Sequence, residues 1–384
     1  MYLLSIPILS DIENLYNNLS NAFRKRPDLP PGTRTVVYAV KNLAPYGGLE
    51  TRLLAYAAAL TENGHRVVFV TERNRNREIN AGYTCLHLNF HARNFPKSLG
   101  RIIAAHKVDV VGFQIKNRRS VHRLDLEALK KQCRIGCVVH GEIIGMDTSI
   151  LRSMDYRIVI SDRLLTIDYA HLGHYVTLPN AIDAGQPVWA YRGQRKALIV
   201  SRLQNDKFMQ LCAAIEFCTA RGIPFEIAGR PVNSATTKRL KRRYALRSDV
   251  FAPGAVNTRE FLERNTDRYL FVAGVGQVLL EAGAAGFPCL LASDKGAEYS
   301  TFLTRHNIRE NYGRNLTLAH PVQRHVEVRV PEFDPDKLKD YDISGIIRED
   351  FSFSRRFNEY LACIRPEIRS SDIRPLSSSP GDCS

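Results

Sequence analysis

The feature that most constrains the fold is an alternation of short β-branched runs with helical stretches, which occurs twice along the chain. In the first series, the runs TVVYAV (35–40) and RVVFVT (66–71) flank a helical pattern over Leu49 to Glu62. Strands that alternate with helices predict a parallel sheet joined by crossover helices. A second series of the same kind begins with KALIVSRL at Lys196. The chain is therefore predicted to be an α/β protein with two Rossmann-like halves.

The remaining predicted elements follow the same pattern in each half. In the first half they are a helix near Lys97 to His106 and the runs VDVVGFQI (108–115), RIGCVVH (134–140) and YRIVIS (156–161). In the second half they are a helix over Lys207 to Arg221, FEIAGR (225–230), a basic helix near Lys238 to Arg247, DVFAPG (249–254), RYLFVAG (268–274), a helix from Val278 to Gly286, and PCLLAS (288–293).

The length of 384 residues also suggests two domains. The turn-rich stretch LPNAIDAGQPVWAYRGQ (178–194) is the natural hinge between them. A helix is predicted from Asp11 to Phe23, and the polar C-terminus is predicted to be disordered. The predicted organisation is an N-terminal extension (1–34), a first Rossmann-like domain (35–190), a second one (191–350), a C-terminal helix that crosses back (351–366) and a tail (367–384).

Charge and cysteine content restrict the function without choosing one. The chain has 54 Lys and Arg against 39 Asp and Glu, a net charge of +15, which favours anionic ligands such as nucleotides, nucleic acid or an acidic membrane surface. Eight scattered cysteines make neither a disulfide framework nor a zinc site, because Cys133 and Cys137 are not spaced as Cys-x-x-Cys. No apolar run reaches the ~20 residues that span a bilayer, and the N-terminus fits a secretory signal poorly. We therefore expect a cytoplasmic protein.

The first candidate site is the turn between the first strand and the first helix, which contains Gly47 and Gly48. Glycine lets a backbone approach an anion closely, and the N-terminal end of the following helix offers free N–H groups and the positive end of its dipole. A phosphate or a sugar hydroxyl is the expected ligand. The alternative is a simple tight turn, because neither a dinucleotide fingerprint nor a Walker A sequence is present.

The second candidate site is VSRLQNDK (200–207), which follows the first strand of the second half. Arg202 offers a planar fork and Lys207 a mobile point charge, so together they suit the neutralisation of a diphosphate as negative charge builds on it. The alternative interpretation is an ordinary pair of solvated cations.

The third candidate site is a glycine-rich turn that contains Gly274 and Gly276 and leads into a helix with Glu281 in its first turns. A carboxylate in this position can accept both hydroxyls of a ribose. Alternatively, it is a charge complement to the helix N-terminus and needs no ligand. A fourth candidate is His140, which ends a predicted strand and should stand at the carboxyl edge of the sheet, where α/β proteins bind ligands. The alternative is a histidine with a structural role only.

Taken together and in this order, these segments resemble the nucleotide-sugar glycosyltransferases of the GT-B fold, in particular glycosyltransferase family four. The resemblance covers about Val36 to Ile364. Its carriers are GGLE (47–50), NGHRVVFVT (63–71), HG (140–141), LPNAID (178–183), VSRLQNDK (200–207), PFEIAG (224–229) and LLEAGAAGFP (279–288). The resemblance implies two facing Rossmann-like domains with a donor cleft between them, and retaining sugar transfer without a metal or other cofactor.

The resemblance also implies roles for individual residues. Arg202 and Lys207 match the pair that holds the donor diphosphate, and Glu281 matches the carboxylate that binds the ribose. In the first domain, Gly47 and Gly48 would lie against the donor phosphates, and His140 matches the histidine near the reacting sugar. These matches make His140, Arg202 and Lys207 the expected catalytic residues.

One departure from the family pattern puts the donor sugar in doubt. The family commonly carries a second Glu eight positions before the one matched by Glu281, and this chain has Ala273 there. The turn that contains Gly276 and Gln277 is expected to supply backbone N–H groups and one amide instead. The chain also reads NAID and SRL where the family usually has NGID and GRL.

The leading hypothesis is a retaining glycosyltransferase that adds a sugar to a polysaccharide, lipopolysaccharide or glycolipid acceptor. Basic clusters at Arg73, Arg75 and Arg77, at 116–123, at 129–131 and at 238–247 favour reversible attachment to an anionic membrane surface at the inner face of the membrane. The alternative is a catalytically weak GT-B-like scaffold that binds nucleotide. A nucleic-acid binder is disfavoured because no recognition module is visible, and a dehydrogenase because the glycine fingerprint is missing.

Overall fold

The computed structural model describes most of the two predicted halves. The described residues are 33–44, 47–115, 125–140, 149–161, 175–183, 185–230, 234–252, 258–313, 316, 334 and 337–364. The predicted helix from Asp11 to Phe23, the basic run 116–123 and the predicted tail lie outside them.

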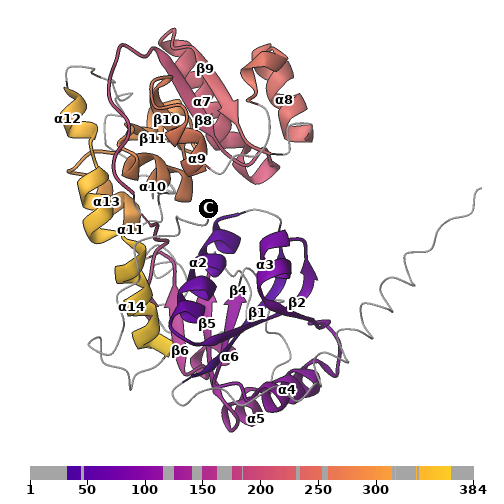
Figure 1. Ribbon diagram of the computed structural model, residues 1–384. Coiled ribbons are helices and arrows are strands. Elements are labelled where there is room, and N and C mark those ends of the chain that lie inside the picture. The colour runs from indigo at the N-terminus through magenta and orange to yellow at the C-terminus, as the bar shows by residue number, and fades with distance from the viewer. Residues whose placement is uncertain are drawn as a thin grey trace, which may run out of the picture. The chain divides into compact units, whose positions relative to one another are not determined.

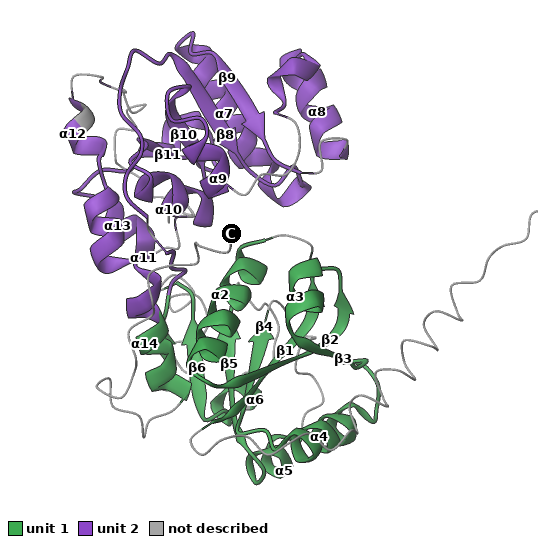
Figure 2. Cartoon of the chain, viewed as in Figure 1, with its two compact units in different colours: residues 1–178, 357–384 green, residues 179–356 purple. Residues whose placement is uncertain are grey.

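The chain divides into two compact units, shown in Figure 2. Unit 1 contains residues 1–178 and 357–384, and unit 2 contains residues 179–356. The predicted hinge segment thus belongs to unit 2 from Pro179 onward. The reason is packing: the backbone N–H groups of Val188 and Trp189 both donate to the carbonyl of Ala285 (3.0 Å), and the indole N–H of Trp189 donates to the carbonyl of Tyr269 (2.9 Å).

Unit 1 is built on a seven-stranded parallel sheet with the strand order β3-β2-β1-β4-β5-β6-β7 (Figure 1). Its strands are β1 (Thr35–Leu43), β2 (Arg66–Asn74), β3 (Thr84–His87), β4 (Val110–Ile115), β5 (Arg134–Val139), β6 (Tyr156–Val159) and β7 (Val176–Thr177). Residues 36–40 in the interior strand β1 are all buried, as expected for a parallel strand that is covered on both faces. The short strands β3 and β7 were not predicted, because neither has a long apolar run.

The described helices of unit 1 are α2 (Gly48–Glu62), α3 (Arg77–Gly82), α4 (Phe95–His106), α5 (Leu126–Lys130), α6 (Ser149–Arg152) and most of α14 (Phe353–Ile364). In α4, the residues Leu99, Ile102, Ile103 and His106 are buried, and their spacing of three and four places them on one face. From Phe357 onward α14 belongs to unit 1, where Phe357 and Tyr360 pack their rings against Tyr56 of α2 with centroid distances of 5.9 and 4.7 Å.

Unit 2 contains a five-stranded sheet with the order β12-β11-β10-β8-β9, in which only the pairing of β11 with β12 is antiparallel. Its strands are β8 (Lys196–Val200), β9 (Phe225–Ala228), β10 (Tyr269–Gly274), β11 (Cys289–Leu291) and β12 (Thr301–Phe302). Residues 249–252, the described part of the run DVFAPG, do not form the strand that its place in the series suggested. They contribute to the short 3-10 helix η5 (Ser248–Val250) and to an isolated bridge between Phe251 and Ile227.

The described helices of unit 2 cover this sheet and connect its strands. They are the 3-10 helices η4 (Asn205–Lys207) and η6 (Ala297–Tyr299), and the α-helices α7 (Phe208–Ala220), α8 (Ala235–Tyr244), α9 (Thr258–Glu263), α10 (Gln277–Ala284), α11 (Ile308–Gly313), α12 (Leu338–Tyr341) and α13 (Ser344–Asp350). The predicted basic helix is α8, which begins earlier than expected because the side chain of Ser234 accepts the N–H of Thr237 (3.0 Å) as a helix cap.

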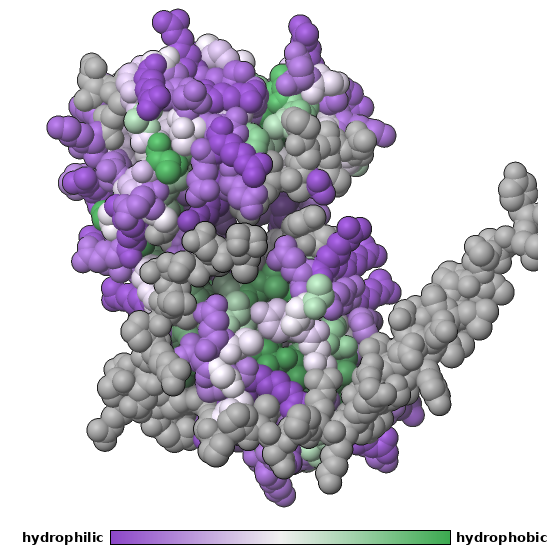
Figure 3. Space-filling view, viewed as in Figure 1, coloured by the Kyte–Doolittle hydropathy of each residue, from purple (hydrophilic) through white to green (hydrophobic). Residues whose placement is uncertain are grey.

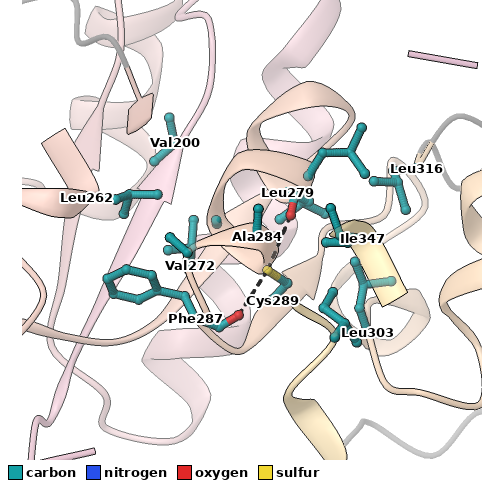
Figure 4. Packing of buried hydrophobic residues seen from close by; sticks show 14 of the residues in the cluster. Val200, Leu262, Val272, Leu279, Ala284, Phe287, Cys289, Leu303, Leu316 and Ile347 are labelled. Carbon is teal, nitrogen blue, oxygen red and sulfur yellow. Dashed lines mark hydrogen bonds between the residues drawn. The ribbon is translucent and has the colours of Figure 1, made fainter. Parts of the chain in front are cut away.

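One of the two buried clusters of unit 2 joins α10 to the sheet and to α13 (Figure 4). The thiol of Cys289 lies between two carbonyl groups, those of Phe287 (3.3 Å) and Leu279 (3.5 Å). At Gly283 in α10 a Cβ atom would lie 2.7 Å from the side chain of Ile347, so the absence of a side chain lets α13 approach closely. This packing holds α10 in a fixed position under the end of β10.

A buried carboxylate ties together the amino ends of three strands of unit 2. Glu226 in β9 accepts hydrogen bonds from Lys196 (2.8 Å), Arg268 (2.6 Å) and the hydroxyl of Tyr269 (2.6 Å). Burial alone would raise the pKa of the Glu226 carboxyl, but these three hydrogen bonds outweigh burial and lower the pKa below its usual value. The network therefore stabilises the fold when Glu226 is ionised.

We predict that Glu226→Gln lowers the free energy of unfolding at neutral pH by about 1–3 kcal/mol, because two cations lose their charged acceptor. A lowered folded-state pKa means that this contribution is present above the unfolded-state pKa of about 4.3 and is lost as the pH falls through the folded-state value. Urea unfolding at pH 7 and at pH 4 or below measures this effect. The difference in the free energy of unfolding between wild type and Glu226→Gln should be smaller in acid. Asp249→Asn, which breaks an exposed pair with Arg247, should cost under about 1 kcal/mol. If the difference in the free energy of unfolding between wild type and Glu226→Gln did not change with pH, the ionised Glu226 carboxylate would not be the stabilising group.

Candidate functional site

The predicted site residues fall into two groups, one in each unit. Unit 2 contains Arg202, Lys207, Gly276, Gln277 and Glu281, all of which follow the carboxyl ends of β8 or β10. Unit 1 contains the other predicted residues, which are Gly47 and Gly48 after β1 and His140 after β5.

The group in unit 2 lies where the strand order reverses. The chain leaves β8 towards β9 on one side of the sheet and leaves β10 towards β11 on the other, so the connections after these two neighbouring strands run in opposite directions. Ligands of α/β proteins bind at such switch points. At Gly274, the last residue of β10, a Cβ atom would lie 2.8 Å from the carbonyl of Val200, the last residue of β8. The two turns that follow these strands are therefore direct neighbours.

The turn after β8 is held rigidly by backbone contacts. The N–H of Ser201 donates to the carbonyl of Ala228 (3.1 Å), and the N–H of Leu203 donates to the carbonyl of Arg230 (2.9 Å). The hydroxyl of Ser234 donates to the carbonyl of Leu203 (2.7 Å). At Gly229, a Cβ atom would lie only 1.8 Å from the carbonyl oxygen of Ser201, so this position requires glycine. Arg202 consequently projects from a fixed backbone into solvent.

The guanidinium of Arg202 has a partner that sequence reasoning missed. It donates to the carboxylate of Asp206 at 2.8 Å, and the two side chains are 51% and 53% exposed. An exposed pair of this kind is worth under about 1 kcal/mol, so a phosphate can compete with Asp206 for the guanidinium. The sequence could have indicated this ion pair, because Arg202 and Asp206 are four positions apart.

Lys207 is the cation that a ligand would stabilise most. It is the last residue of η4 and stands immediately before α7. Burial lowers the pKa of its ammonium group and the charge of Arg202 lowers it further, whereas Asp206 and Asp294 raise it. Among the residues that the structure describes, no carboxylate forms an ion pair with this ammonium. An incoming anion would supply the missing counter-charge.

The turn after β10 departs from the prediction at Gly276. Its φ of 66° requires glycine, but its N–H donates to the carbonyl of Leu316 (3.0 Å) rather than pointing to an open site. The residues that begin α10 are Gln277 and Val278, whose N–H groups have no acceptor within the helix. These two groups take the place of Gly276 as the backbone donors that this turn offers to an anion.

Glu281 lies one helical turn after Gln277 on the same helix and is partly exposed. Burial raises the pKa of its carboxyl group, while hydrogen bonds from the side chains of Thr258 and Gln277 and the charge of Arg259 lower it. The Gln277 amide therefore orients Glu281, and it also makes a long contact with the carbonyl of Ala181 (3.5 Å). A carboxylate whose charge is disfavoured by burial gains from additional donors, such as the hydroxyl groups of a ribose.

The structure explains the residue at the family's second carboxylate position. Ala273 lies inside β10, is fully buried, and belongs to the cluster that contains Ile199 and Leu290. Its side chain points into the core of unit 2, so a carboxylate at this position would face apolar residues.

In unit 1, the turn before α2 is fixed by a buried carboxylate. Glu50 is only 2% exposed and accepts the backbone N–H of Ala44 (2.9 Å). Gly47 precedes the helix and Gly48 begins it, and a Cβ atom at Gly48 would meet nothing within 4 Å. The open space above Gly48 leaves room for a ligand to approach the helix N-terminus.

His140 is positioned by β4, the neighbour of its own strand. Its backbone N–H donates to the carbonyl of Ile115 (3.0 Å), and its Nε2 lies 2.8 Å from the side-chain oxygen of Gln114. The amide nitrogen of Gln114 donates to the carbonyl of Gly112 (3.5 Å), and its oxygen accepts a hydrogen bond from the Nε2–H group of His140. Gln114 thus orients the imidazole. The sequence could have indicated this role, because Gln114 is a lone amide side chain in an otherwise apolar strand.

Other kinds of site receive no support within the described ranges. There, no group of three or more His, Cys, Asp or Glu side chains could hold a metal ion. Burial raises the pKa of both Cys133 and Cys137 to about 12, so these thiols are poor ligands and nucleophiles. None of the described helices is both long enough and apolar enough to span a membrane.

Comparison with known proteins places the fold. No protein-family model and no curated protein sequence matches the chain. Its structure is similar to that of a glycosyltransferase from Rickettsia africae ESF-5, with a TM-score of 0.62, 13% identity and coverage of 87% of this chain and 98% of that one. It is also similar to an α-glucosyltransferase solved with UDP and a 13-mer DNA, with a TM-score of 0.53, 13% identity and coverage of 87% and 100%. The chain therefore has the GT-B fold, and its membership of family four stays a prediction.

The buried position of Ala273 generates a stability prediction. Ala273→Glu should lower the free energy of unfolding by about 3 kcal/mol or more, because it buries an unpaired carboxylate in the core of unit 2. Thermal and urea unfolding measure this loss, and Ala235→Glu is the matched control because Ala235 is exposed in the first turn of α8. If Ala273→Glu kept full stability and accelerated sugar transfer, position 273 would face the ligand after all.

Proposed function

We propose that the protein is a glycosyltransferase that moves a sugar from a nucleoside diphosphate sugar to a hydroxyl group of an acceptor. The observation that carries this proposal is the pair of cations at the switch point of unit 2, where Arg202 shares a weak exposed pair and Lys207 has a pKa lowered by burial. A GT-B unit with such a pair suits a diphosphate. In this proposal unit 2 binds the donor, with Glu281 on the ribose, and unit 1 binds the acceptor.

The chemical role of the two cations follows from where charge develops. During transfer, the bond between the anomeric carbon and the diphosphate oxygen breaks, a bond from that carbon to the acceptor oxygen forms, and the acceptor hydroxyl gives its proton to the departing diphosphate. Negative charge then accumulates on the diphosphate, and preorganised donors at that position stabilise the transition state. Arg202 and Lys207 supply the positive charge that neutralises it, without a metal ion. The N–H groups of Gln277 and Val278 add two further donors.

We also propose that configuration at the anomeric carbon is retained, that Gly48 lies against the donor phosphates and that His140 contacts the reacting sugar. These assignments rest on the resemblance to the family pattern, which GGLE and HG carry in unit 1. They are consistent with a glycine that leaves open space and a histidine held in place by Gln114. The anomeric configuration of the product, read by NMR coupling constants, tests the first assignment.

The acceptor proposed here is a polysaccharide, lipopolysaccharide or glycolipid intermediate, reached by a protein that attaches reversibly to the inner face of a membrane. Exposed cations support it, since Lys238, Arg239, Arg242 and Arg243 are all exposed on α8. The similar α-glucosyltransferase was solved with DNA, so the expectation that this chain avoids nucleic acid needs its own test. Oligonucleotides therefore belong in any acceptor panel.

A second candidate is a scaffold that binds nucleotide without transferring sugar. The specific observation in its favour is Ala273, because the chain has no carboxylate at the position where related enzymes contact the donor sugar. It predicts nucleotide binding without turnover.

The decisive experiment measures the release of free nucleotide diphosphate from a panel of nucleotide sugars, with and without EDTA. We expect slow release from one donor that is insensitive to EDTA. Arg202→Ala should reduce it about 30- to 1000-fold, the equivalent of ~2–4 kcal/mol for one preorganised donor. The control is Arg247→Ala, since Arg247 is 84% exposed and pairs only with Asp249 among the described residues. Nucleotide binding without release, even in the presence of acceptors, would favour the scaffold, and a chain that does not bind nucleotide would refute both candidates.

The lowered pKa of Lys207 predicts the pH dependence of nucleotide binding. Because the ammonium must be charged to hold a diphosphate, affinity for UDP or GDP should fall as the pH rises through the free enzyme's lowered Lys207 pKa, earlier than for an ordinary lysine near 10.4. Calorimetric titrations from neutral to alkaline pH measure this decline. Lys207→Arg keeps its charge and should flatten the profile. An identical decline in both proteins would show that another group is responsible.

A further inference from the structure

An alternating motif, Arg-Asn-Arg-Asn-Arg (73–77), connects β2 to α3 in unit 1. We call its three arginines, Arg73, Arg75 and Arg77, the arginine strip. The donor chemistry described above makes no use of them, and all three side chains are exposed.

The two asparagines between them build the backbone that carries the strip. The side-chain oxygen of Asn74 accepts the N–H of Asn76 (2.8 Å), and its amide nitrogen donates to Asn80 (2.8 Å). Asn76 is buried and accepts the N–H of Ile79 (3.0 Å). Because the inward positions are tied to the protein, the backbone presents the three arginines on its outward side.

The strip keeps its charge available for a partner. Within the described part of the chain, none of the three arginines forms an ion pair with a carboxylate. Glu72, which precedes the strip, faces Lys41 instead (4.0 Å). Glu78 is exposed beside Arg77 and forms no ion pair with it among the described residues. A repeated anion is the natural counterpart of three such cations.

The strip lies at the carboxyl edge of the parallel sheet, where ligands of this fold bind. The N–H of Arg75 donates to the carbonyl of Leu43 (3.0 Å), the last residue of β1, just before the turn with Gly47 and Gly48. Along the edge, β2 is followed by β1, β4 and then β5, which ends beside His140. Three strand spacings of about 4.8 Å place the end of β2 about 14 Å from the end of β5.

We propose that the arginine strip binds the phosphate groups of an acceptor that carries repeated phosphate esters, while its reacting hydroxyl lies nearer to His140. This inference rests on the proposed function, because only a glycosyltransferase would use the bound molecule as an acceptor. Arginine favours phosphate because its planar fork makes two parallel hydrogen bonds.

The surroundings of the strip favour a polar chain over a membrane. The large hydrophobic side chains that are exposed among the described residues are Val176, Val188, Tyr191, Met209 and Tyr299, and none of them is near the strip in the sequence. In the view of Figure 3, hydrophilic residues cover most of the described surface of unit 2, and apolar residues form small separate areas. In unit 1, residues 72–78, which carry the strip, include no apolar side chain, so a partner of the strip is held by charge.

The test compares two triple variants that lose the same charge. The first is Arg73→Ser, Arg75→Ser, Arg77→Ser. The control is Lys97→Ser, Arg101→Ser, Lys131→Ser, three exposed cations on α4 and just after α5. The probes are a fluorescent glycerol phosphate oligomer, phosphatidylglycerol vesicles and a DNA duplex, each titrated at low and at moderate salt.

We expect the glycerol phosphate oligomer to bind wild type and the control equally, and the strip variant about ten- to a hundredfold more weakly, with a shallower salt dependence. If the phosphatidylglycerol vesicles bind wild type and the control but not the strip variant, the phosphate groups that the strip recognises belong to a lipid. Equal weakening of oligomer binding in both triple variants would overturn the proposal. So would a protein that binds the DNA duplex and does not bind the oligomer. Should the triple variant fold poorly, Arg75→Ser and Arg75→Lys provide the same comparison, because Lys keeps the charge and loses the fork.

A separate measurement distinguishes failure of this inference from failure of the proposed function. Thermal stabilisation of wild type by UDP or GDP tests the donor site in unit 2 and does not involve the strip. If the oligomer binds through the strip and no nucleotide binds, the donor proposal fails while the phosphate-binding surface stands. If nucleotide binds and removal of the strip leaves oligomer binding unchanged, the strip proposal fails alone.

Discussion

The proposed donor site depends on close contact between backbones at the end of β8. Both strands that flank β8 are followed or ended by a glycine that packs against it. A Cβ atom at Gly229 would lie 1.8 Å from the carbonyl of Ser201, and one at Gly274 would lie 2.8 Å from the carbonyl of Val200. Without these glycines the turns after the three strands would move apart. Their contact allows residues that are distant in sequence to share one edge of the sheet.

The two ends of the sheet in unit 2 use charge in opposite ways. At the amino end, Glu226 is surrounded by Lys196, Arg268 and Tyr269, and its hydrogen bonds lower its pKa. At the carboxyl end, burial lowers the pKa of Lys207, and Arg202 has only one exposed partner. A paired charge stabilises the fold, whereas an incompletely paired charge favours the binding of an anion. The same sheet therefore separates structural charge from charge that is available for chemistry.

Unit 1 also separates polar residues that stabilise the fold from groups that are available to a ligand. Buried Glu50, Gln114 and Asn76 satisfy backbone groups or orient a neighbouring side chain. Gly48 and the arginines at 73, 75 and 77 are left facing outward. Polar side chains that are inside thus determine where the outward groups stand. This arrangement is typical of parallel sheets, because every β–α turn reaches the same edge.

Much of the fold could be predicted from the sequence because it depends on local patterns. The α/β class, the two halves and the placement of Arg202 and Lys207 after β8 follow from the alternation of apolar runs with helical stretches and from strand ends. The sequence could not predict that β8 lies between β9 and β10, since strand order depends on pairing between distant segments. Nor could it predict that DVFAPG forms no strand in the described residues.

At the site, the sequence determined the chemical character of the groups, and the tertiary structure decided which of them are available. The motifs identified Arg202, Lys207, Glu281, Gly48 and His140 as candidates because residue type and strand ends are visible in the sequence. Only the structure showed that the N–H of Gly276 is used by Leu316 and that Ala273 points into the core. Availability depends on burial and on hydrogen-bond partners far along the chain, and neither is encoded in a local pattern.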